Sequence, residues 1–510
     1  MAGTPNADRS RASNSARRRL TALALTALLF ASSVVAQQAA TAPARALPLK
    51  RFPDSRLTKT DAQGFYHMPT GIGDDYFDGT DNLARVRRHL RTARALGAKY
   101  LRCAFSWNGI EKKQGVYAWD FWDRLVAEAE RHNIELIPYV AYTPEWAARP
   151  GEDFWKQPPR DNALFAEFME KIAARYRGRI RSWELWNEPD LREYWQGTTA
   201  EFADLVRQGA AAVRRADPNA VIVLGGMSLG PTPFFTQLMQ QHRIAAYVDI
   251  IAQHGYPESW HPQRGEAIYF GWTRDIGELI AASASGVDFW LNEIGYPDYR
   301  YSATNASKYG GTDVFYRYEH TAQYQGAYLF KSFTMALASG NASIASWYRI
   351  DDFPRTERRL GDDLIHFHLG VVDERGRPKP GFHAFQFFNR LLGVPTRPVK
   401  DAGATARRRD SKAVVNIFER KDSRIVVAAW LRSSERDEVP RHTGMLADTR
   451  FEQISVQLPC RQVPRVQFFS PFGHAISTTA KLQITPHRTS LTNIPLRGDT
   501  VFVAVAECVK

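Results

Sequence analysis

The sequence has few cysteines. Its 510 residues include only Cys103, Cys460 and Cys508, too few for the disulfide framework of many exported domains, so a hydrophobic core must hold the fold. Cys103 lies within an apolar run and is expected to be a small buried side chain. Cys460 and Cys508 share the carboxy-terminal region, where both a bridge and two free thiols are open alternatives.

Two signals of nucleotide and nucleic-acid binding are missing. No G-x-G-x-x-G motif follows the first apolar run, which disfavours a dinucleotide-binding sheet. The formal net charge is +13, of which residues 1–36 carry five Arg and one Asp. The remainder has no Lys/Arg run dense enough for a nucleic-acid arm, so its positive charge is treated as background and no nucleic-acid partner is expected.

Only the amino terminus has a long apolar segment. Arg17–Arg19 precede the uncharged stretch Leu20–Ala36, which ends in the small residues Val34 and Ala36. This order is typical of a signal peptide, so residues 1–36 are expected to be removed from an exported, periplasmic or extracellular protein without stable membrane insertion. The stretch approaches membrane-spanning length, and an uncleaved anchor is the alternative. An Ala-rich linker is expected over 37–62.

From residue 63 to 396, short apolar runs alternate with amphipathic helical patterns, as expected for parallel strands joined by helices. The runs are Gly64–Met68, Tyr100–Trp107, Ile134–Tyr142, Ile180–Asn187, Val221–Gly225, Val248–His254, Asp288–Asn292 and Ile344–Tyr348. Eight strands with helices between them predict an α/β fold, a (β/α)8 TIM barrel. Gly381–Leu392 is expected to be its last helix. An open doubly wound sheet is the alternative.

Residues 397–510 change to short alternating runs without long helices. They lie at Ala413–Phe418, Ile425–Leu431, Ile454–Gln457, Arg465–Phe469 and Val501–Ala506. This spacing predicts a carboxy-terminal β-sandwich. The sandwich either buttresses the barrel or binds carbohydrate, and the sequence favours the buttress.

Two glutamates end predicted barrel strands. Glu188 follows Trp186-Asn187 at the end of the fourth run, and Glu293 follows Asn292 at the end of the seventh. The carboxyl ends of barrel strands form the active face, and a carboxylate there is costly unless it is paired or functional. Two carboxylates across one mouth suit glycosidic bond cleavage: one protonates the leaving oxygen and the other attacks, at about 5 Å in a retaining enzyme.

Several motifs together resemble clan A of the glycoside hydrolases, particularly family 39. They are Asn187-Glu188-Pro189, the later strand-terminal Glu293, and the stretches Trp107–Glu111, Gly115–Asp120 and Ala141–Trp146. The resemblance implies retention of configuration, with Glu188 as acid/base and Glu293 as nucleophile. The end of the third strand, Tyr142-Thr143, departs from the His of several clan families, and Asn292 stands where Thr is common.

The resemblance also implies substrate-binding residues. Arg102 matches the arginine that holds the nucleophile ionised, and Asn187 matches the asparagine that binds the sugar 2-hydroxyl. His254 and Tyr256 match donors beside the nucleophile, and Trp347 matches the tryptophan that floors the subsite of the attacked sugar. Trp146 is expected to contact sugar. No cofactor is expected, because two carboxylates suffice for the reaction. No metal site is expected at His366 and His368, because no third ligand is spaced nearby in the sequence.

These features favour a retaining β-glycosidase that acts on a polysaccharide or oligosaccharide. Endo action is favoured by tryptophans expected near the rim, at positions 107, 146, 186, 195, 260 and 272. An exo-acting β-xylosidase-like enzyme is the rival within this class. A non-catalytic polysaccharide-binding or matrix-assembly protein is the alternative outside it. The sequence does not indicate an oligomeric state.

Overall fold

The computed structural model describes residues 60–509, except 77–78, 80–81, 229, 258, 260–265, 284–285, 299–319, 355–364, 400–403, 407–410 and 433–446. The predicted signal peptide and nearly all of the predicted linker lie outside these residues. Among the described helices, none combines the length and apolarity needed to cross a bilayer.

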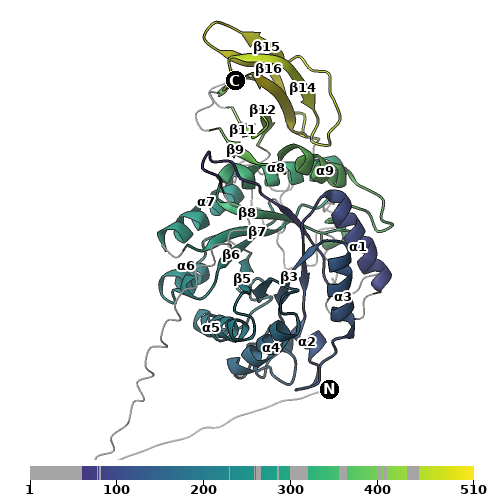
Figure 1. Cartoon of the computed structure of the whole chain (residues 1–510), viewed down its shortest axis with the longest axis vertical. Helices are drawn as coiled ribbons and strands as arrows, with labels where there is room; N and C mark the ends of the chain where they lie inside the picture. Colours follow the sequence, from purple (N-terminus) through teal and green to yellow (C-terminus); the bar gives the residue numbers. More distant parts are fainter. Residues whose placement is uncertain are drawn as a thin grey trace, which may run out of the picture. The chain divides into compact units, whose positions relative to one another are not determined.

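Eight parallel strands close into a barrel in the order β1 to β8 (Figure 1), which confirms the predicted (β/α)8 fold. The strands are β1 (Thr70–Gly73), β2 (Tyr100–Ala104), β3 (Glu135–Val140), β4 (Ser182–Leu185), β5 (Val221–Met227), β6 (Ile250–Gly255), β7 (Asp288–Ile294) and β8 (Ala342–Tyr348). Each pairs in parallel with the next, and β1 closes the ring with β8.

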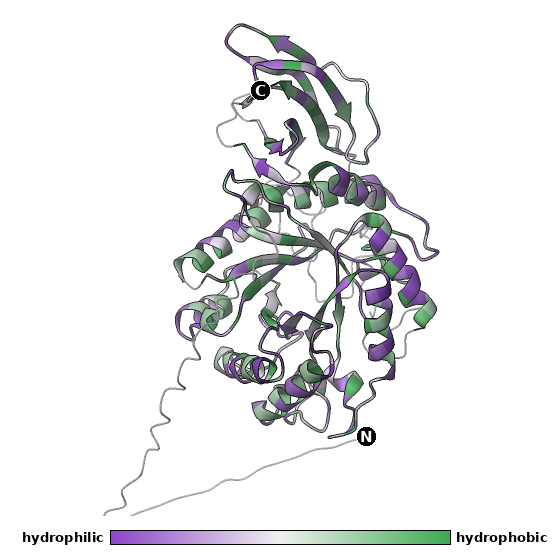
Figure 2. Ribbon diagram, viewed as in Figure 1, coloured by the Kyte–Doolittle hydropathy of each residue, from purple (hydrophilic) through white to green (hydrophobic). Residues whose placement is uncertain are grey.

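Helices surround the barrel and carry hydrophobic and hydrophilic stripes (Figure 2). They are α1 (Leu83–Leu96), α2 (Trp107–Ile110), α3 (Asp120–Arg131), α4 (Asn162–Arg175), α5 (Thr199–Ala216), α6 (Pro233–Gln240), α7 (Glu266–Ala282), α8 (Ala322–Ser339) and α9 (Pro380–Leu392). Side chains cap several of them. Thr198 and Glu201 form a reciprocal capping box at α5, and such a box satisfies two backbone donors that have no intrahelical partner.

The first barrel strand differs from the sequence-based prediction. The run Gly64–Met68 forms only an isolated bridge, between Tyr66 and Thr396, and β1 begins at Thr70. The sequence Thr-Gly-Ile-Gly was overlooked because glycine weakens strand propensity. The barrel interior requires these glycines: a Cβ on Gly71 would lie 2.9 Å from the Ser346 hydroxyl, and one on Gly73 would lie 3.1 Å from the Tyr348 ring.

Inward side chains fill the lower barrel. Tyr100, Ile137, Val223, Trp290 and Ile344 belong to one interior cluster. Outward residues of the same strands join the main core between sheet and helices. Because side chains alternate along a strand, the next inward positions above this cluster face the carboxyl-terminal mouth.

The carboxy-terminal region forms two antiparallel sheets, consistent with the predicted sandwich. One has the order β10-β13-β16-β15 and the other β14-β17-β12-β11-β9. The strands are β9 (Thr396–Pro398), β10 (Ala404–Ala406), β11 (Ala413–Arg420), β12 (Arg424–Leu431), β13 (Phe451–Leu458), β14 (Gln462–Phe469), β15 (Lys481–Ile484), β16 (Thr489–Arg497) and β17 (Phe502–Val509). The prediction missed β9, β10, β15 and β16. Two of these have three residues, and β16 contains Pro495.

Strand β12 is buried on both faces. Val426 and Trp430 belong to the main barrel core, whereas Val427 and Ala429 belong to the core between the two sheets. The Trp430 indole donates to Glu266 Oε1 of α7 at 2.7 Å. A strand covered on both sides reads as a continuous apolar run, as Ile425–Leu431 does. These contacts are those of a buttress packed on the barrel.

Cys460 and Cys508 are joined by a disulfide, and Cys103 is a buried free thiol. The bridge closes a segment of 48 residues. Because a cross-link removes conformations from the unfolded chain, a loop of this length contributes about 4 kcal/mol in the chain-entropy description.

We expect the paired change Cys460→Ser and Cys508→Ser to lower the free energy of unfolding by up to ~4 kcal/mol without lowering kcat/KM. Denaturant unfolding with and without reductant measures this. Cys103→Ser is the matched control for loss of a thiol. An unchanged unfolding midpoint in the double variant would show that the bridge does not stabilise the protein.

Candidate active site

A buried arginine lies at the centre of the barrel mouth. Arg102 on β2 is 2% exposed and donates to both oxygens of Glu184, at 2.8 and 2.9 Å. It also donates to Glu293 Oε2 at 2.5 Å and to Asn187 Oδ1 at 2.7 Å. A planar guanidinium with a fixed fork of donors is suited to such bridging. Arg102 therefore fixes Glu293 and Asn187 relative to each other.

Glu184 on β4 is the residue that holds this arginine, and the sequence reasoning missed it. It is fully buried and accepts two further hydrogen bonds, from the Gly226 amide at 3.0 Å and from Asn292 Nδ2 at 2.9 Å. The signal was an acidic residue in the middle of a buried strand, where a charge requires a partner. Asn292, noted as a departure from the clan pattern, is a ligand of this carboxylate.

Glu293 lies on β7 within reach of two donors. Besides Arg102, the Tyr256 hydroxyl donates to Glu293 Oε1 at 2.5 Å, which places Tyr256 beside this carboxylate as expected. Burial raises the pKa of Glu293 above its ordinary value, and the charge of Arg102 and the Tyr256 hydrogen bond oppose that rise. These donors stabilise the ionised form.

Glu188 follows β4 in a strained turn. Its φ is +45° and that of Trp186 is +81°, a left-handed conformation that side chains other than glycine rarely adopt and that often marks functional sites. Its amide donates to the Gly226 carbonyl at 3.1 Å. The turn directs the carboxylate toward the barrel axis, where His254 Nδ1 lies 2.8 Å from Glu188 Oε1.

His254 lies between the two glutamates, 3.7 Å from Glu293 Oε1. Burial lowers the pKa of His254, so the neutral ring is favoured, and the tautomer with its proton on Nδ1 would donate to Glu188. A Cβ on Gly226 would lie 2.0 Å from His254 Nε2, so the close approach of this ring requires glycine.

The two glutamates are close enough to act on one atom. One oxygen from each, together with a His254 ring nitrogen, lie within 4.8 Å of one another. Retaining glycosidases hold their carboxyl groups about 5–5.5 Å apart, whereas inverting enzymes leave a wider gap for water. This spacing suits a double displacement.

Asn187 is fixed on both sides of its amide. Its Oδ1 accepts from Arg102, and its Nδ2 donates to the Tyr142 hydroxyl at 3.1 Å. Tyr142, at the third-strand position where several clan families have histidine, thus contacts the same network.

Trp347 lies on the opposite side of β8 from the expected one. It is fully buried in the core between sheet and helices, and its indole donates to the Leu369 carbonyl at 3.2 Å. Tyr348 instead points into the mouth, with its ring against Gly73 and 6.4 Å from the Tyr256 ring. The expectation for Trp347 is wrong because alternation gives the inward positions of β8 to Ile344, Ser346 and Tyr348.

The expected rim tryptophans are mostly core residues. Trp107, Trp186 and Trp195 are at most 1% exposed, and position 260 lies outside the described residues. Trp146 is half-buried; it packs edge-on against Trp107 and donates to the Glu111 carbonyl, and none of its described contacts is with either glutamate. Trp272 on α7 is also half-buried. The burial of Trp107, Trp186 and Trp195 weakens the observation that favoured endo action.

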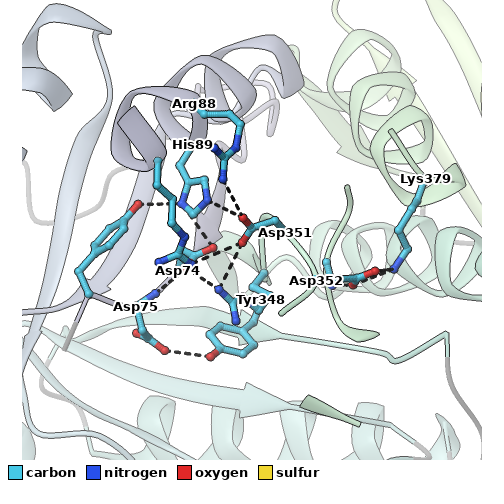
Figure 3. A network of polar contacts seen from close by, with 12 residues as sticks. Asp74, Asp75, Arg88, His89, Tyr348, Asp351, Asp352 and Lys379 are labelled. Carbon is cyan, nitrogen blue, oxygen red and sulfur yellow. Dashed lines mark hydrogen bonds and ion pairs between the residues drawn. The ribbon is translucent and has the colours of Figure 1, made fainter. Parts of the chain in front are cut away.

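Three described clusters have the composition of metal sites: Glu188 with His254 and Glu293, Asp74 with His89 and Asp351, and Asp298 with Asp352 and His368. Cations of the chain already balance each one. Arg102 pairs with Glu293, Arg349 with Asp74, and Lys379 with both Asp298 and Asp352. Figure 3 shows the second cluster and the Asp352–Lys379 pair. A metal would have to displace these ion pairs.

Comparisons with known proteins relate the chain to glycoside hydrolases. Residues 62–285 match the family described as Cellulase (glycosyl hydrolase family 5); the match contains Glu188 and ends before Glu293. A β-xylosidase of Geobacillus stearothermophilus is 23% identical over 374 residues, 69% of each chain. A β-xylosidase of Caldicellulosiruptor saccharolyticus is 23% identical over 46% of this chain and 48% of its own length.

Solved structures share the fold. A family 39 glycoside hydrolase from Bacteroides cellulosilyticus WH2 has a TM-score of 0.61 and 17% identity, over 86% of this chain and 81% of its own. A family 39 β-xylosidase from Caulobacter crescentus has a TM-score of 0.54 and 17% identity, over 86% and 96%.

The chain is a glycoside hydrolase, and its barrel is similar to those of clan A enzymes. The two glutamates of this glycosidase lie after β4 and on β7 of one barrel. Trp347 and Tyr348 are neighbours on opposite faces of β8. Substituting each in turn therefore distinguishes a residue of the core from a residue of the active site.

We expect Tyr348→Phe to lower kcat/KM on an aryl glycoside by about tenfold, since it removes one hydrogen bond within the mouth, with little change in melting temperature. Trp347→Phe is the matched variant. It should lower the free energy of unfolding by about 2 kcal/mol through lost packing and leave kcat/KM unchanged. If Trp347→Phe lowers kcat/KM while Tyr348→Phe does not, Trp347 is the residue that acts in the active site.

Proposed function

We propose that this retaining glycosidase cleaves β-linked oligosaccharides or polysaccharides with Glu293 as nucleophile and Glu188 as acid/base. The single observation that carries the proposal is the approach of the two carboxylates to within 4.8 Å, with Arg102 and Tyr256 on one and His254 on the other.

The chemistry follows from these partners. Protonated Glu188 gives its proton to the leaving oxygen while ionised Glu293 attacks the anomeric carbon, so the glycosidic bond breaks as an ester forms. Glu188 then takes a proton from water, the hydroxide oxygen attacks the anomeric carbon, and Glu293 leaves as a carboxylate. Asn187, held by Arg102, is placed to donate to the sugar 2-hydroxyl.

The substrate we propose is a β-xyloside or a closely related β-glycoside. We propose that the enzyme acts on it in exo mode and releases the terminal sugar. The two curated relatives described above are β-xylosidases, and three of the tryptophans expected at the rim, Trp107, Trp186 and Trp195, are buried instead. We propose export to the periplasm or extracellular space because of the leader over residues 1–36.

Endo action on a polysaccharide is the second candidate. A cavity of about 570 Å³ begins at Pro189 and Asp190, next to Glu188, and is lined by polar side chains including Arg192, Gln237 and Gln241. Since Glu188 is on the leaving-group side, such a groove suits a longer leaving chain. Sizing the products of an early xylan digest separates the candidates: xylose from the start supports exo action, and oligomers alone support endo action.

We expect a 2-fluoro xyloside with a good leaving group to attach covalently to Glu293, detected by peptide mass spectrometry. Glu293→Gln should lose more than about a thousandfold in kcat and should not be labelled. Glu188→Gln should still be labelled when the leaving group needs no proton. A wild-type protein that binds xylan but is labelled by no sugar would favour the non-catalytic binding protein.

We expect Tyr256→Phe to move the acid limb of the kcat/KM profile to higher pH. The Tyr256 hydroxyl lowers the pKa of Glu293, attack needs ionised Glu293, and removal of the hydroxyl raises the pKa at which this carboxylate gains its proton. Tyr66→Phe, a buried tyrosine outside the mouth, is the control. If the acid limb of Tyr256→Phe is not shifted, the hydrogen bond between Tyr256 and Glu293 does not control the ionisation that limits activity at low pH.

A further inference from the structure

A further carboxylate, besides Glu188, Glu293 and Glu184, lies at the mouth of the barrel and has no part in the mechanism above. Asp75 follows β1 and retains partial exposure to solvent. The Tyr139 hydroxyl donates to its Oδ1 at 2.7 Å, and the Tyr348 hydroxyl donates to its Oδ2 at 2.9 Å. Both tyrosines belong to inward positions of barrel strands, so Asp75 faces the same hollow as the glutamates.

Asp75 is connected to Glu293 on two sides. On one side, Tyr348 packs against Tyr256, and Tyr256 donates to Glu293. On the other, the Arg102 guanidinium, which also donates to Glu293, lies 4.4 Å from the centre of the Tyr139 ring. These contacts form a closed circuit of side chains around the mouth. Asp75 is the carboxylate of this circuit whose described hydrogen bonds come from tyrosine hydroxyls and not from a cation.

The neighbouring Asp74 explains how Asp75 is held. Asp74 is fully buried and points away from the mouth, toward Arg349 at 2.7 Å and Arg85 at 3.0 Å (Figure 3). Its amide also donates to the Arg102 carbonyl at 3.0 Å. The buried ion pairs fix the backbone after β1, and the next side chain is directed inward. In the close-up, Asp75 and Tyr348 lie together below this cluster.

The charge of the mouth restricts the sugar. Its acidic groups are Asp75, Glu188, Glu293 and Glu184. In the described circuit, Arg102 pairs with two of them, Glu184 and Glu293. Burial, and the proximity of Asp74, raise the pKa of Asp75, which is the response of a carboxylate short of donors. Sugar hydroxyls supply such donors, and a sugar carboxylate would repel it.

We propose that Asp75 is a substrate-binding residue that accepts hydrogen bonds from ring hydroxyls of an uncharged sugar in the subsite of the attacked ring, and that it excludes uronic acids. This inference rests on the proposed function, because it places the sugar against Glu293. It assigns the attacked sugar as a neutral pentose or hexose even though the chain as a whole is basic.

The experiment pairs Asp75→Asn with nitrophenyl β-xyloside and with analogues that each lack one ring hydroxyl. A hydrogen bond to a charged group contributes about 10- to 100-fold, so we expect Asp75→Asn to lose that factor in kcat/KM on the parent xyloside. One deoxy analogue should lose a similar factor with wild type and almost none with Asp75→Asn. If Asp75 has a purely structural role, Asp75→Asn should lower kcat/KM by the same factor on every substrate.

Nitrophenyl β-glucuronide tests the exclusion. Wild type should not cleave it detectably. In Asp75→Asn, the difference in kcat/KM between nitrophenyl β-glucuronide and nitrophenyl β-glucoside should be smaller than in wild type. The matched control is Asp153→Asn, a surface aspartate paired with Lys156, which should match wild type on every substrate.

Three outcomes would overturn the inference: Asp75→Asn within twofold of wild type, no hydroxyl-specific coupling, or a glucuronide or amino-sugar glycoside cleaved faster than its neutral parent. Labelling of Glu293 by the 2-fluoro xyloside is measured in the same preparations. If Glu293 is labelled while the Asp75 predictions fail, the proposed function is kept and the role of Asp75 is rejected. If wild type is neither labelled nor active, the proposed function fails first.

Discussion

The ion pair between Arg102 and Glu184 is the constraint on which the active site depends. Both side chains are buried, and breaking such a pair by removing one partner typically destabilises a protein by about 3–5 kcal/mol. With Glu184 holding two of its donors, the guanidinium has a fixed direction for the others. The remaining donors of Arg102 hold Glu293 and Asn187 in place. Asn187 in turn donates to the Tyr142 hydroxyl and so orients Tyr142.

Close packing around glycines makes this network possible. Gly73 gives room to the Tyr348 ring, and Gly226 gives room to His254 while its backbone contacts both Glu184 and Glu188. A side chain at either position would displace a polar group of the mouth. The site is thus shaped by residues without side chains as much as by the acids, because the barrel interior has little free volume.

The carboxy-terminal sheets complete the fold away from the chemistry. Strand β12 shares one face with the barrel core and the other with the second sheet, and Trp430 ties it to Glu266 of α7. The described contacts are those of a support that buries apolar surface of the barrel.

The sequence by itself indicated the barrel, seven of its eight strands and the two strand-end glutamates, because hydrophobic period and position along a strand are local properties. It also indicated Arg102, Asn187, His254 and Tyr256, through resemblance. Only the tertiary structure decided that Tyr348 faces the mouth while Trp347 does not, and that Asp75 joins the circuit around Glu293. Adjacent strand residues point to opposite faces, and the β7–β8 pairing contains register shifts, so the inward face follows from pairing between distant segments.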